Sequence, residues 1–263
     1  DQHPQTYYMV AIAGLEVGKV GFGAMGMAFA YGPPMTEANA AMLLTAIYES
    51  GYRHLDTSEI YASTFPKPDN EDTVHCETLI GKWLAMSGIP RSEISIATKC
   101  NPAARWGGKT DPETVAQMVE ASLARLGTDY IDVYYLHRLP PQGPEEFVQS
   151  MLPILACGKV KALGISEASA ANIRKAHAIA PLALAQYEWS LLERGVESEI
   201  VPTCKELGIT VVAYSPLARN LLALGNDAAA VVENRVGFRA GNPRFDEANL
   251  ETNLALAKVV SDL

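Results

Sequence analysis

Hydrophobic and polar residues follow two patterns that alternate along this chain. Short, almost wholly apolar runs predict buried strands, and between them lie amphipathic runs with apolar residues at helical spacing. The clearest amphipathic run is DPETVAQMVEASLARLG (111–127), which has an Asp cap, a Pro in its first turn and a closing glycine. A second helix is predicted over 36–50, with a Thr cap at its start and Gly51 at its end.

Seven apolar runs predict strands, and nearly every one is followed by a helical pattern. The runs are KVGFGAM, RHLDTS, ISIATK, YIDVYYLH, VKALGIS, LALAQYEWS and ITVVAYSPL. Strand–helix units that recur about every 30 residues favour a closed (β/α)8 TIM barrel over two nucleotide-binding halves. We therefore expect one α/β domain over residues 1–263, with YYMVAIAG as part of an N-terminal β-hairpin that caps the barrel bottom.

The predicted barrel lacks its eighth strand–helix unit. After the seventh strand come an irregular stretch (218–245) and one helical run, DEANLETNLALAKVVSDL, up to Leu263. A closed barrel needs a further unit of about 30 residues. We therefore expect the barrel to be incomplete at its C-terminal end.

The hexapeptide GFGAMG (21–26) has the G-x-G-x-x-G spacing of a dinucleotide-binding turn, but its context argues against that interpretation. Such a turn leads at once into a helix whose N-terminus holds a pyrophosphate. Here MAFAYGPPM follows, and its two prolines delay any helix until near Thr36. We therefore expect no Rossmann turn.

Composition and charge narrow the class of ligand. The chain is 48% hydrophobic, its net charge is −9 and its pI is about 5.1. Since no Lys/Arg cluster occurs, we expect neither nucleic acid nor a membrane as a partner, which leaves small molecules. The four cysteines form no C-x-x-C pair and no signal peptide or membrane-spanning run is evident, so we expect free thiols in a cytoplasmic protein. The scattered histidines predict no metal site.

Polar residues gather at the C-terminal ends of the predicted strands, where a barrel of this type carries its active site. The second strand leads into Asp56 and Tyr61. The third ends at Lys99 and the fourth at His137. The later strands end in Ser166, Glu167, Gln186, Tyr214 and Ser215. Each residue alone has an ordinary structural explanation, such as a turn, an ion pair or packing, but their convergence at one mouth favours a catalytic site.

The first four of these residues could transfer a proton. A lysine desolvated at a strand end needs an acid beside it, and Asp56 is the natural partner of Lys99. We expect the Lys99 charge to lower the pKa of Tyr61, so that this phenol can protonate a carbonyl oxygen. His137 could hydrogen-bond the same oxygen and orient it.

Several strings together resemble the aldo-keto reductase superfamily, in particular its microbial, fungal and plant branch related to potassium-channel β subunits. They are GFGAMGM, LDTSEIY, ATK, YYLHR, GKVKALGISEAS, AQYEWSLLER and VVAYSPLAR, and the likeness extends over about 14–253. The resemblance implies that Asp56, Tyr61, Lys99 and His137 form a catalytic tetrad. It also implies a cofactor, NADPH or NADH, bound in extended form.

The resemblance further implies which residues hold the cofactor. The backbone of Ala24 and Met25 would lie near the nicotinamide ribose, and Asp56 is expected among the contacts. Ser166 and Gln186 would hold the carboxamide and Tyr214 would stack on the ring. The pyrophosphate loop would contain Ser215, Leu217 and Arg219.

The chain departs from the pattern of this superfamily in several places. Glu167 replaces a common Asn, Ala62 and Asn220 replace common glycines, and the loop ASTFPKPDNEDTVHC (62–76) is longer than usual. In the superfamily the adenosine half of the cofactor is bound around the eighth strand. The branch usually uses NADPH, but the sequence does not decide between NADPH and NADH, and it does not indicate an oligomeric state.

Three functions remain open on sequence grounds. The first is a carbonyl reductase acting on an aldehyde or ketone, in which Tyr61 donates the proton. The second is a regulatory subunit that binds the cofactor with little turnover. The third is a barrel aldolase in which Lys99 forms a Schiff base, although an adjacent Asp56 would keep that lysine charged. Candidate walls of the substrate pocket are Phe29, Tyr31, Phe65, Trp106 and Leu139.

Overall fold

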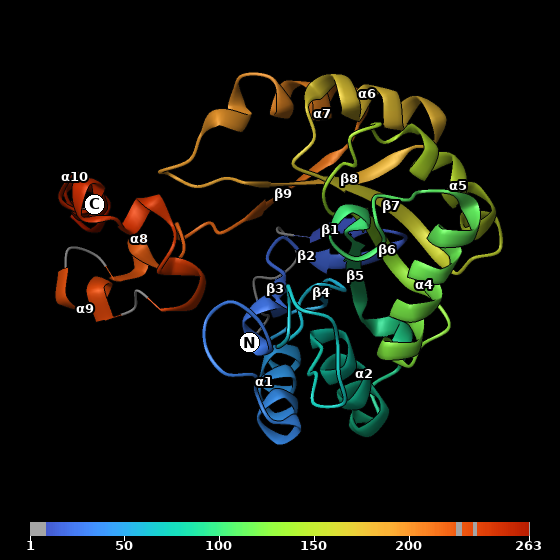
Figure 1. Cartoon of the computed structure of the whole chain (residues 1–263), viewed down its shortest axis with the longest axis horizontal. Helices are drawn as coiled ribbons and strands as arrows, with labels where there is room; N and C mark the ends of the chain where they lie inside the picture. The colour runs from blue at the N-terminus through green and yellow to red at the C-terminus, as the bar shows by residue number, and fades with distance from the viewer. Residues whose placement is uncertain (1–8, 225–227, 234–235, 263) are drawn as a thin grey trace.

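A computed structural model describes residues 9–224, 228–233 and 236–262 and shows a curved parallel sheet surrounded by helices (Figure 1). The sheet has seven strands in the order β3-β4-β5-β6-β7-β8-β9, and every neighbouring pair is parallel. Their bounds are Phe22–Gly23, His54–Asp56, Ser95–Cys100, Ile131–Leu136, Val160–Ser166, Leu182–Glu188 and Thr210–Tyr214. This arrangement confirms the predicted α/β barrel class.

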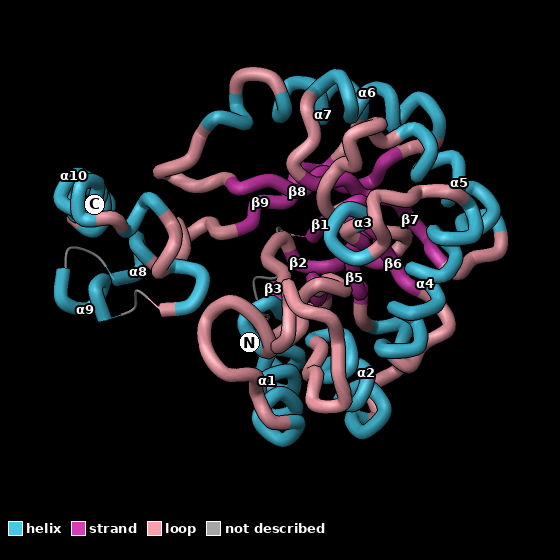
Figure 2. Tube along the Cα trace, viewed as in Figure 1, coloured by secondary structure: helices cyan, strands magenta, loops and turns pink. Residues whose placement is uncertain are grey.

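Six helices cover the outer face of the sheet (Figures 1 and 2). They are α1 (Glu37–Glu49), α2 (Cys76–Ser87), α4 (Pro112–Leu126), α5 (Glu145–Ala156), α6 (Ala170–Ile179) and α7 (Ile200–Leu207), and α3 (Pro102–Arg105) is a single turn after β5. The predicted caps are present, since Thr36 accepts a hydrogen bond from Asn39 N and Asp111 accepts one from Thr114 N. Gly127 ends α4 in the left-handed region, where glycine carries no steric cost.

A β-hairpin closes the bottom of the barrel, as the sequence predicts. Its strands β1 (Met9–Ile12) and β2 (Leu15–Gly18) pair antiparallel, while residues 7 and 8 of the predicted segment lie outside the described residues. Ile12 and Val17 pack against Ala97 and Val133 of the barrel interior. The hairpin therefore buries the apolar floor of the barrel and leaves the opposite end of the strands as its mouth.

The segment GFGAMG forms no dinucleotide-binding turn. It contains the short strand β3 and a 3-10 turn (Ala24–Met27), and the next α-helix begins only at Glu37. The two prolines lie in the loop between them, as expected.

Within the described residues the ring of strands is open between β3 and β9, the two ends of the sheet. The helices α8 (Leu221–Leu224), α9 (Ala228–Glu233) and α10 (Glu247–Ser261) form a separate group beside β9 (Figures 1 and 2). They share a small core that includes Leu221, Val231 and Phe245. The predicted terminal helix is present as α10, but the stretch 218–245, which was expected to be irregular, contains the short helices α8 and α9. Among the described residues, no helix is long and apolar enough to cross a membrane.

Candidate active site

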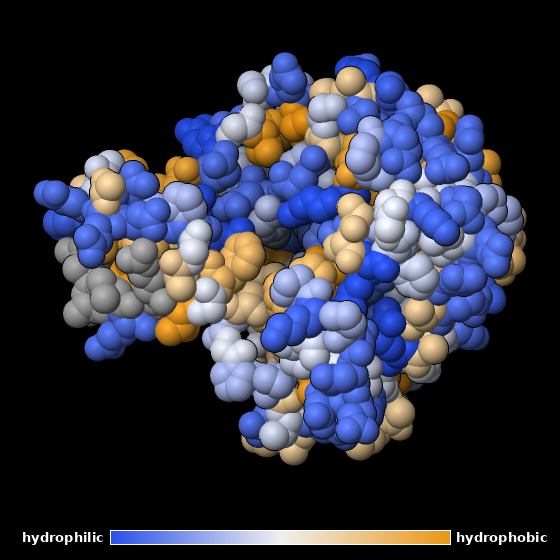
Figure 3. Space-filling view, viewed as in Figure 1, coloured by the Kyte–Doolittle hydropathy of each residue, from blue (hydrophilic) through white to orange (hydrophobic). Residues whose placement is uncertain are grey.

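A cavity of about 600 Å³ opens at the C-terminal ends of the strands. Its walls come from the ends of β3, β4, β6, β7, β8 and β9 and from residues 238 and 239. Figure 3 shows a hollow near the centre of this face, between the ring of helices and the α8–α10 group. A second hollow of about 740 Å³ lies outside the ring around Leu84, Leu123 and Lys159 and contains none of the predicted site residues.

Lys99 is fully buried at the end of β5 and is held by two oxygens. Its Nζ donates to Asp56 Oδ1 and, at 2.8 Å, to the backbone oxygen of Thr57. Burial lowers the pKa of Lys99, and the neighbouring Asp56 carboxylate opposes that shift. Gln186 Nε2 donates to the other Asp56 oxygen at 2.8 Å, so the carboxylate is held from both sides. Because Lys99 does not line the cavity, this geometry opposes the Schiff-base alternative.

Tyr61 lines the cavity and lies beside this ion pair. Its ring centroid is 5.2 Å from Lys99 Nζ, and the ring meets His137 edge-on at 5.8 Å. Burial, and then the Asp56 carboxylate, raise the pKa of Tyr61 above its usual value. The expectation of a lowered Tyr61 pKa is therefore wrong, because desolvation of the phenolate is the largest effect on this group and raises its pKa.

His137 directly follows β6, and its backbone N–H donates to Cys100 O at 2.8 Å. The imidazole is buried, and its Nδ1 lies 3.0 Å from Ser58 Oγ. Burial lowers the pKa of His137 well below the usual value, and the charges of Lys99 and Arg138 lower it further. The ring is therefore neutral near pH 7 and forms one wall of the cavity beside Tyr61.

Most of the predicted cofactor residues lie at the ends of β7, β8 and β9 and in the loop after β9, whereas Ala24 and Met25 follow β3. Ser166 and Gln186 are buried at the ends of β7 and β8, and Tyr214 ends β9. Seven of the predicted contacts line the cavity besides Asp56, namely Met25, Ser166, Gln186, Tyr214, Ser215, Leu217 and Arg219. Ala24 does not, because it is fully buried beneath the cavity and its carbonyl accepts the Cys76 thiol at 3.1 Å.

The loop after β9 has an unusual backbone. Ser215, Ala218, Arg219 and Asn220 all have positive φ, between 50° and 80°. Asn220 has the largest value, at the position where the superfamily commonly has glycine, and asparagine is one of the few other residues that tolerate this region. The substitution therefore keeps the loop conformation accessible.

Two arginines that the sequence did not indicate, Arg239 and Arg244, converge with the predicted Arg219 on this loop. Glu188 accepts from Arg219 Nη2 at 3.3 Å and from Arg244 Nη1 at 2.8 Å, and Arg239 Nε donates to Arg219 O at 2.9 Å. Phe238 N also donates to Ala30 O at 2.7 Å, so the segment from 236 to 245 crosses the mouth to the loop after β3. Arg239 and Arg244 lie in a stretch without helical or strand periodicity, and no sequence signal points to them. Arg138, also missed, follows His137 directly and lines the cavity.

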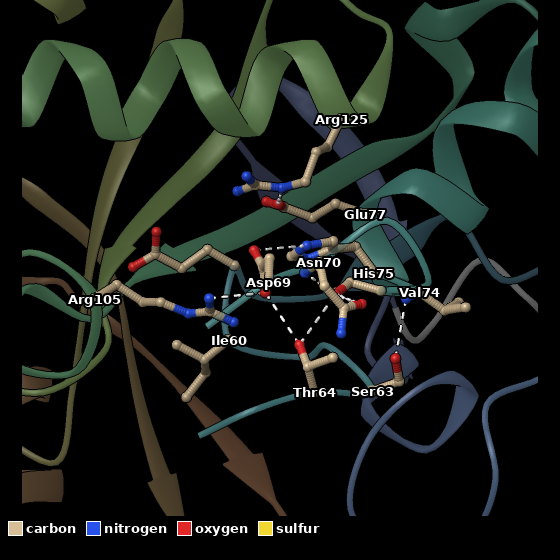
Figure 4. Close-up of polar contacts among 12 residues, drawn as sticks. Ile60, Ser63, Thr64, Asp69, Asn70, Val74, His75, Glu77, Arg105 and Arg125 are labelled. Atoms are coloured by element: carbon tan, nitrogen blue, oxygen red, sulfur yellow. Dashed lines mark hydrogen bonds and ion pairs between the residues drawn. The ribbon is translucent and has the colours of Figure 1, made fainter. Parts of the chain in front are cut away.

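The long loop after β4 forms another part of the rim (Figure 4). Asp69 lies at its centre, where it accepts from Arg105 Nη1 at 2.9 Å and lies 3.1 Å from His75 Nε2 (Figure 4). Phe65 in this loop lines the cavity and meets Phe29 edge-on at 5.6 Å. We call the three residues Asp69, Arg105 and His75 the loop clasp, because they tie this wall to α3 and to the start of α2.

The structure sorts the five candidate pocket walls. Phe29, Tyr31 and Phe65 line the cavity. Trp106 instead packs against the main core and donates from Nε1 to Glu59 Oε2 at 2.9 Å, and Leu139 also packs against that core.

The four cysteines are free, and three of them are buried.

The fold is a TIM-type α/β barrel, and the polar strand-end residues line a cavity at its mouth. The chain belongs to the aldo/keto reductase family, whose sequence model matches residues 19–262. It is 40% identical over 247 residues to "Probable aldo-keto reductase 1" of Glycine max, and the matched region covers 91% of this chain and 67% of that relative.

Two solved structures show the same fold. The glycerol dehydrogenase AKR11B4 from Gluconobacter oxydans matches with a TM-score of 0.76 at 24% identity, over 98% of this chain and 78% of that one. The holo form of the aldo-keto reductase AKR11C1 from Bacillus halodurans matches with a TM-score of 0.67 at 26% identity, over 82% and 68%. Membership of this family identifies the chain as an oxidoreductase of the carbonyl-reducing class.

Proposed function

We propose that the protein is an NADPH-dependent reductase that converts an aldehyde or ketone into an alcohol, with Tyr61 as the proton donor. One observation carries the proposal. A buried phenol and a neutral imidazole share one wall of the cavity beside the Lys99–Asp56 pair, and the opposite wall carries Ser166 and Gln186. Such an arrangement can protonate the oxygen of a carbonyl group while a cofactor bound at the opposite wall reacts with the carbon of the same carbonyl group.

The residues of the opposite wall suit a nicotinamide cofactor. Gln186 Nε2 donates to Asp56, so the amide oxygen of Gln186 remains available to accept from the carboxamide N–H of a nicotinamide. Ser166 adds a hydroxyl to the same wall. Arg219 Nε is buried without a partner among the described residues, so it could pair with a pyrophosphate oxygen. Bound there, NADPH would supply the hydride. The family relative from Bacillus halodurans, solved as a holo form, supports a bound cofactor in this fold.

Tyr61, His137 and Lys99 then have separate roles. Because burial raises the pKa of Tyr61, the phenol stays protonated near pH 7 and can donate its proton to the carbonyl oxygen. Neutral His137 can hydrogen-bond the same oxygen and fix its position. Once the proton has left, the phenolate lies close to the Lys99 ammonium, which stabilises it until it takes a proton back from water.

The test combines turnover with one substitution. NADPH oxidation is measured with a panel of aromatic and aliphatic aldehydes, with NADH in parallel. Tyr61→Phe keeps the ring and removes the proton, so kcat should fall by about 10²-fold or more while cofactor affinity is unchanged. Tyr135→Phe is the matched control, because this tyrosine is also buried near Lys99 but does not line the cavity.

Two results would overturn the proposal. If Tyr61→Phe kept more than half of the wild-type kcat under conditions where hydride transfer limits the rate, Tyr61 would not be the donor. If the protein bound NADPH but reduced no aldehyde or ketone, the alternative of a regulatory cofactor-binding subunit would hold.

A further inference from the structure

Ser58 contacts two of the four candidate catalytic residues, Lys99 and His137. It follows β4 by two positions and is fully buried. Its Oγ lies 3.0 Å from His137 Nδ1 and 3.1 Å from the backbone oxygen of Lys99. A serine hydroxyl has one proton, so it can donate to only one of these two acceptors at a time.

The two choices place the proton of His137 on different nitrogens. If Ser58 donates to Nδ1, the neutral imidazole carries its proton on Nε2, the ring nitrogen left for the cavity that His137 lines. If Ser58 donates to the Lys99 carbonyl, Nδ1 must carry the proton and Nε2 becomes an acceptor. Only the first state can donate a hydrogen bond to a carbonyl oxygen, because both partners in the second state would be acceptors.

The surrounding backbone favours the first state. The Lys99 carbonyl already accepts from Glu59 N at 3.1 Å, so it does not depend on the Ser58 proton. Ser58 Oγ in turn accepts from Ile60 N at 3.5 Å, which leaves its proton as the donor for a further contact. Since His137 is buried among positive charges and stays neutral, one of its ring nitrogens has a free lone pair, and Nδ1 can use it to accept a hydrogen bond from Ser58 Oγ–H.

We infer that Ser58 is a positioning residue, which donates from Oγ to His137 Nδ1 and thereby holds the imidazole in the tautomer that presents N–H to the substrate oxygen. The inference rests on the proposed function in one respect, namely that a carbonyl oxygen is what the imidazole meets. The tautomer itself can be observed without any turnover.

The experiment records NMR spectra of the protein with labelled histidines, because the ring carbon and nitrogen shifts differ between the two neutral tautomers. His137→Gln assigns the signal. We expect the wild-type protein to show the Nε2–H tautomer at His137 and Ser58→Ala to show a mixture of both. Ser58→Thr retains a hydroxyl at this position and should keep the wild-type signal.

The chain offers a matched control at the other end of the same strands. Ser95 Oγ lies 3.0 Å from His54 Nδ1, and both residues are buried at the start of β5 and β4. Ser95→Ala should change the His54 signal and leave both the His137 signal and turnover unchanged. Ser58→Ala should lower kcat about tenfold with an unchanged KM for NADPH, the effect of one neutral hydrogen bond.

The outcomes separate the inference from the proposed function. A wild-type His137 in the Nδ1–H form, or a tautomer that Ser58→Ala leaves unchanged, overturns the inference even if the enzyme reduces aldehydes. A tautomer that depends on Ser58 in a protein that reduces no carbonyl supports the positioning role and overturns the proposed function. If Ser58→Ala does not fold, the wild-type and Ser58→Thr signals still decide the question.

Discussion

The two walls of the cavity are built in different ways. The wall formed by Tyr61 and His137 lies beside the buried Lys99 and rests on β5 and β6, in which every residue is buried. The opposite wall begins with the buried ends of β7 and β8, but it continues onto β9, which is only half-buried, and onto the loop after it, where several residues have positive φ. We call these the catalytic wall and the cofactor wall.

The difference follows from what positions the side chains. On the catalytic wall, parallel pairing sets Lys99 opposite Tyr135 in β6, and the polar side chains then bond to adjacent segments. On the cofactor wall, ion pairs such as Arg244 with Glu188 join segments far apart in sequence. A regular ladder leaves little freedom, whereas a wall held by side-chain contacts can adjust to a ligand. Substitutions on the catalytic wall should therefore affect turnover and stability, and those on the cofactor wall should affect affinity.

The largest effect is expected from Lys99→Met. The substitution leaves the Asp56 carboxylate without its cation, and breaking a buried ion pair costs about 3–5 kcal/mol. It also removes the charge that stabilises the Tyr61 phenolate, so kcat should fall by about 10²-fold or more. Urea unfolding and single-turnover reduction measure the two effects. A variant with wild-type stability would contradict the view that this wall depends on the ion pair.

The catalytic wall should also be the part of the fold that is sensitive to acid. Burial lowers the pKa of His54, His75 and His137. His54 lies on β4 and His137 directly follows β6, while His75 precedes α2 at the end of the loop after β4. The unfolded chain binds protons near pH 6.5 where the folded chain does not, so stability is present above that pH and is lost as the pH falls below it. The slope is about 1.4 kcal/mol per pH unit for each histidine that is protonated only on unfolding.

Urea unfolding between pH 7.5 and pH 5.5, about one unit either side of the unfolded-state pKa, measures this loss. Hydrogen exchange of individual amides locates it. Amides of β5 and β6 should lose more protection than those of β8. If all strands lost amide protection equally, or if the free energy of unfolding did not change with pH, the two walls would not differ in their sensitivity to acid.

A change on the cofactor wall should act on binding. Arg219→Ala removes a guanidinium that lines the cavity, while Glu188 keeps its contact with Arg244. Loss of one charged hydrogen bond should weaken NADPH binding about tenfold. The quenching of protein fluorescence by NADPH measures the affinity, and kcat at saturating cofactor should not change. Arg174→Ala, at an exposed ion pair with Glu206, is the control. A fall in kcat with unchanged NADPH affinity would show that Arg219 acts in turnover and not in cofactor binding.

The smallest effect is expected at the loop clasp. Asp69→Asn weakens the contacts with Arg105 and His75 but leaves the tetrad untouched. Since the clasp fixes the wall that carries Phe65, KM for a bulky aromatic aldehyde should rise about two- to fivefold, as expected for the loss of a half-exposed ion pair. KM for a short aliphatic aldehyde should hardly change. Equal changes for both substrates would show that the clasp does not shape the pocket.

The sequence was sufficient to predict the elements near the tetrad. The strand and helix patterns gave α1 and α4 to within a residue of the structure, because caps such as Thr36 and Asp111 are local signals. The rule that active sites lie at strand ends placed Asp56, Tyr61 and His137 on one cavity. The roles assigned to these residues stay predictions that the experiments above test.

The electrostatics of the site and several of its side-chain contacts could not be predicted, because they depend on residues far apart in the sequence. The order of apolar and polar residues along the chain encodes the buried strands, the helices and the helix caps. The sequence by itself therefore determined a TIM-type barrel and the residues at its mouth. Only the tertiary structure decided that burial controls the Tyr61 phenol, that Arg239 and Arg244 converge on the loop after β9, and that Ser58 meets His137. Desolvation and side-chain geometry arise when strands far apart in sequence pack together, and no local pattern encodes them.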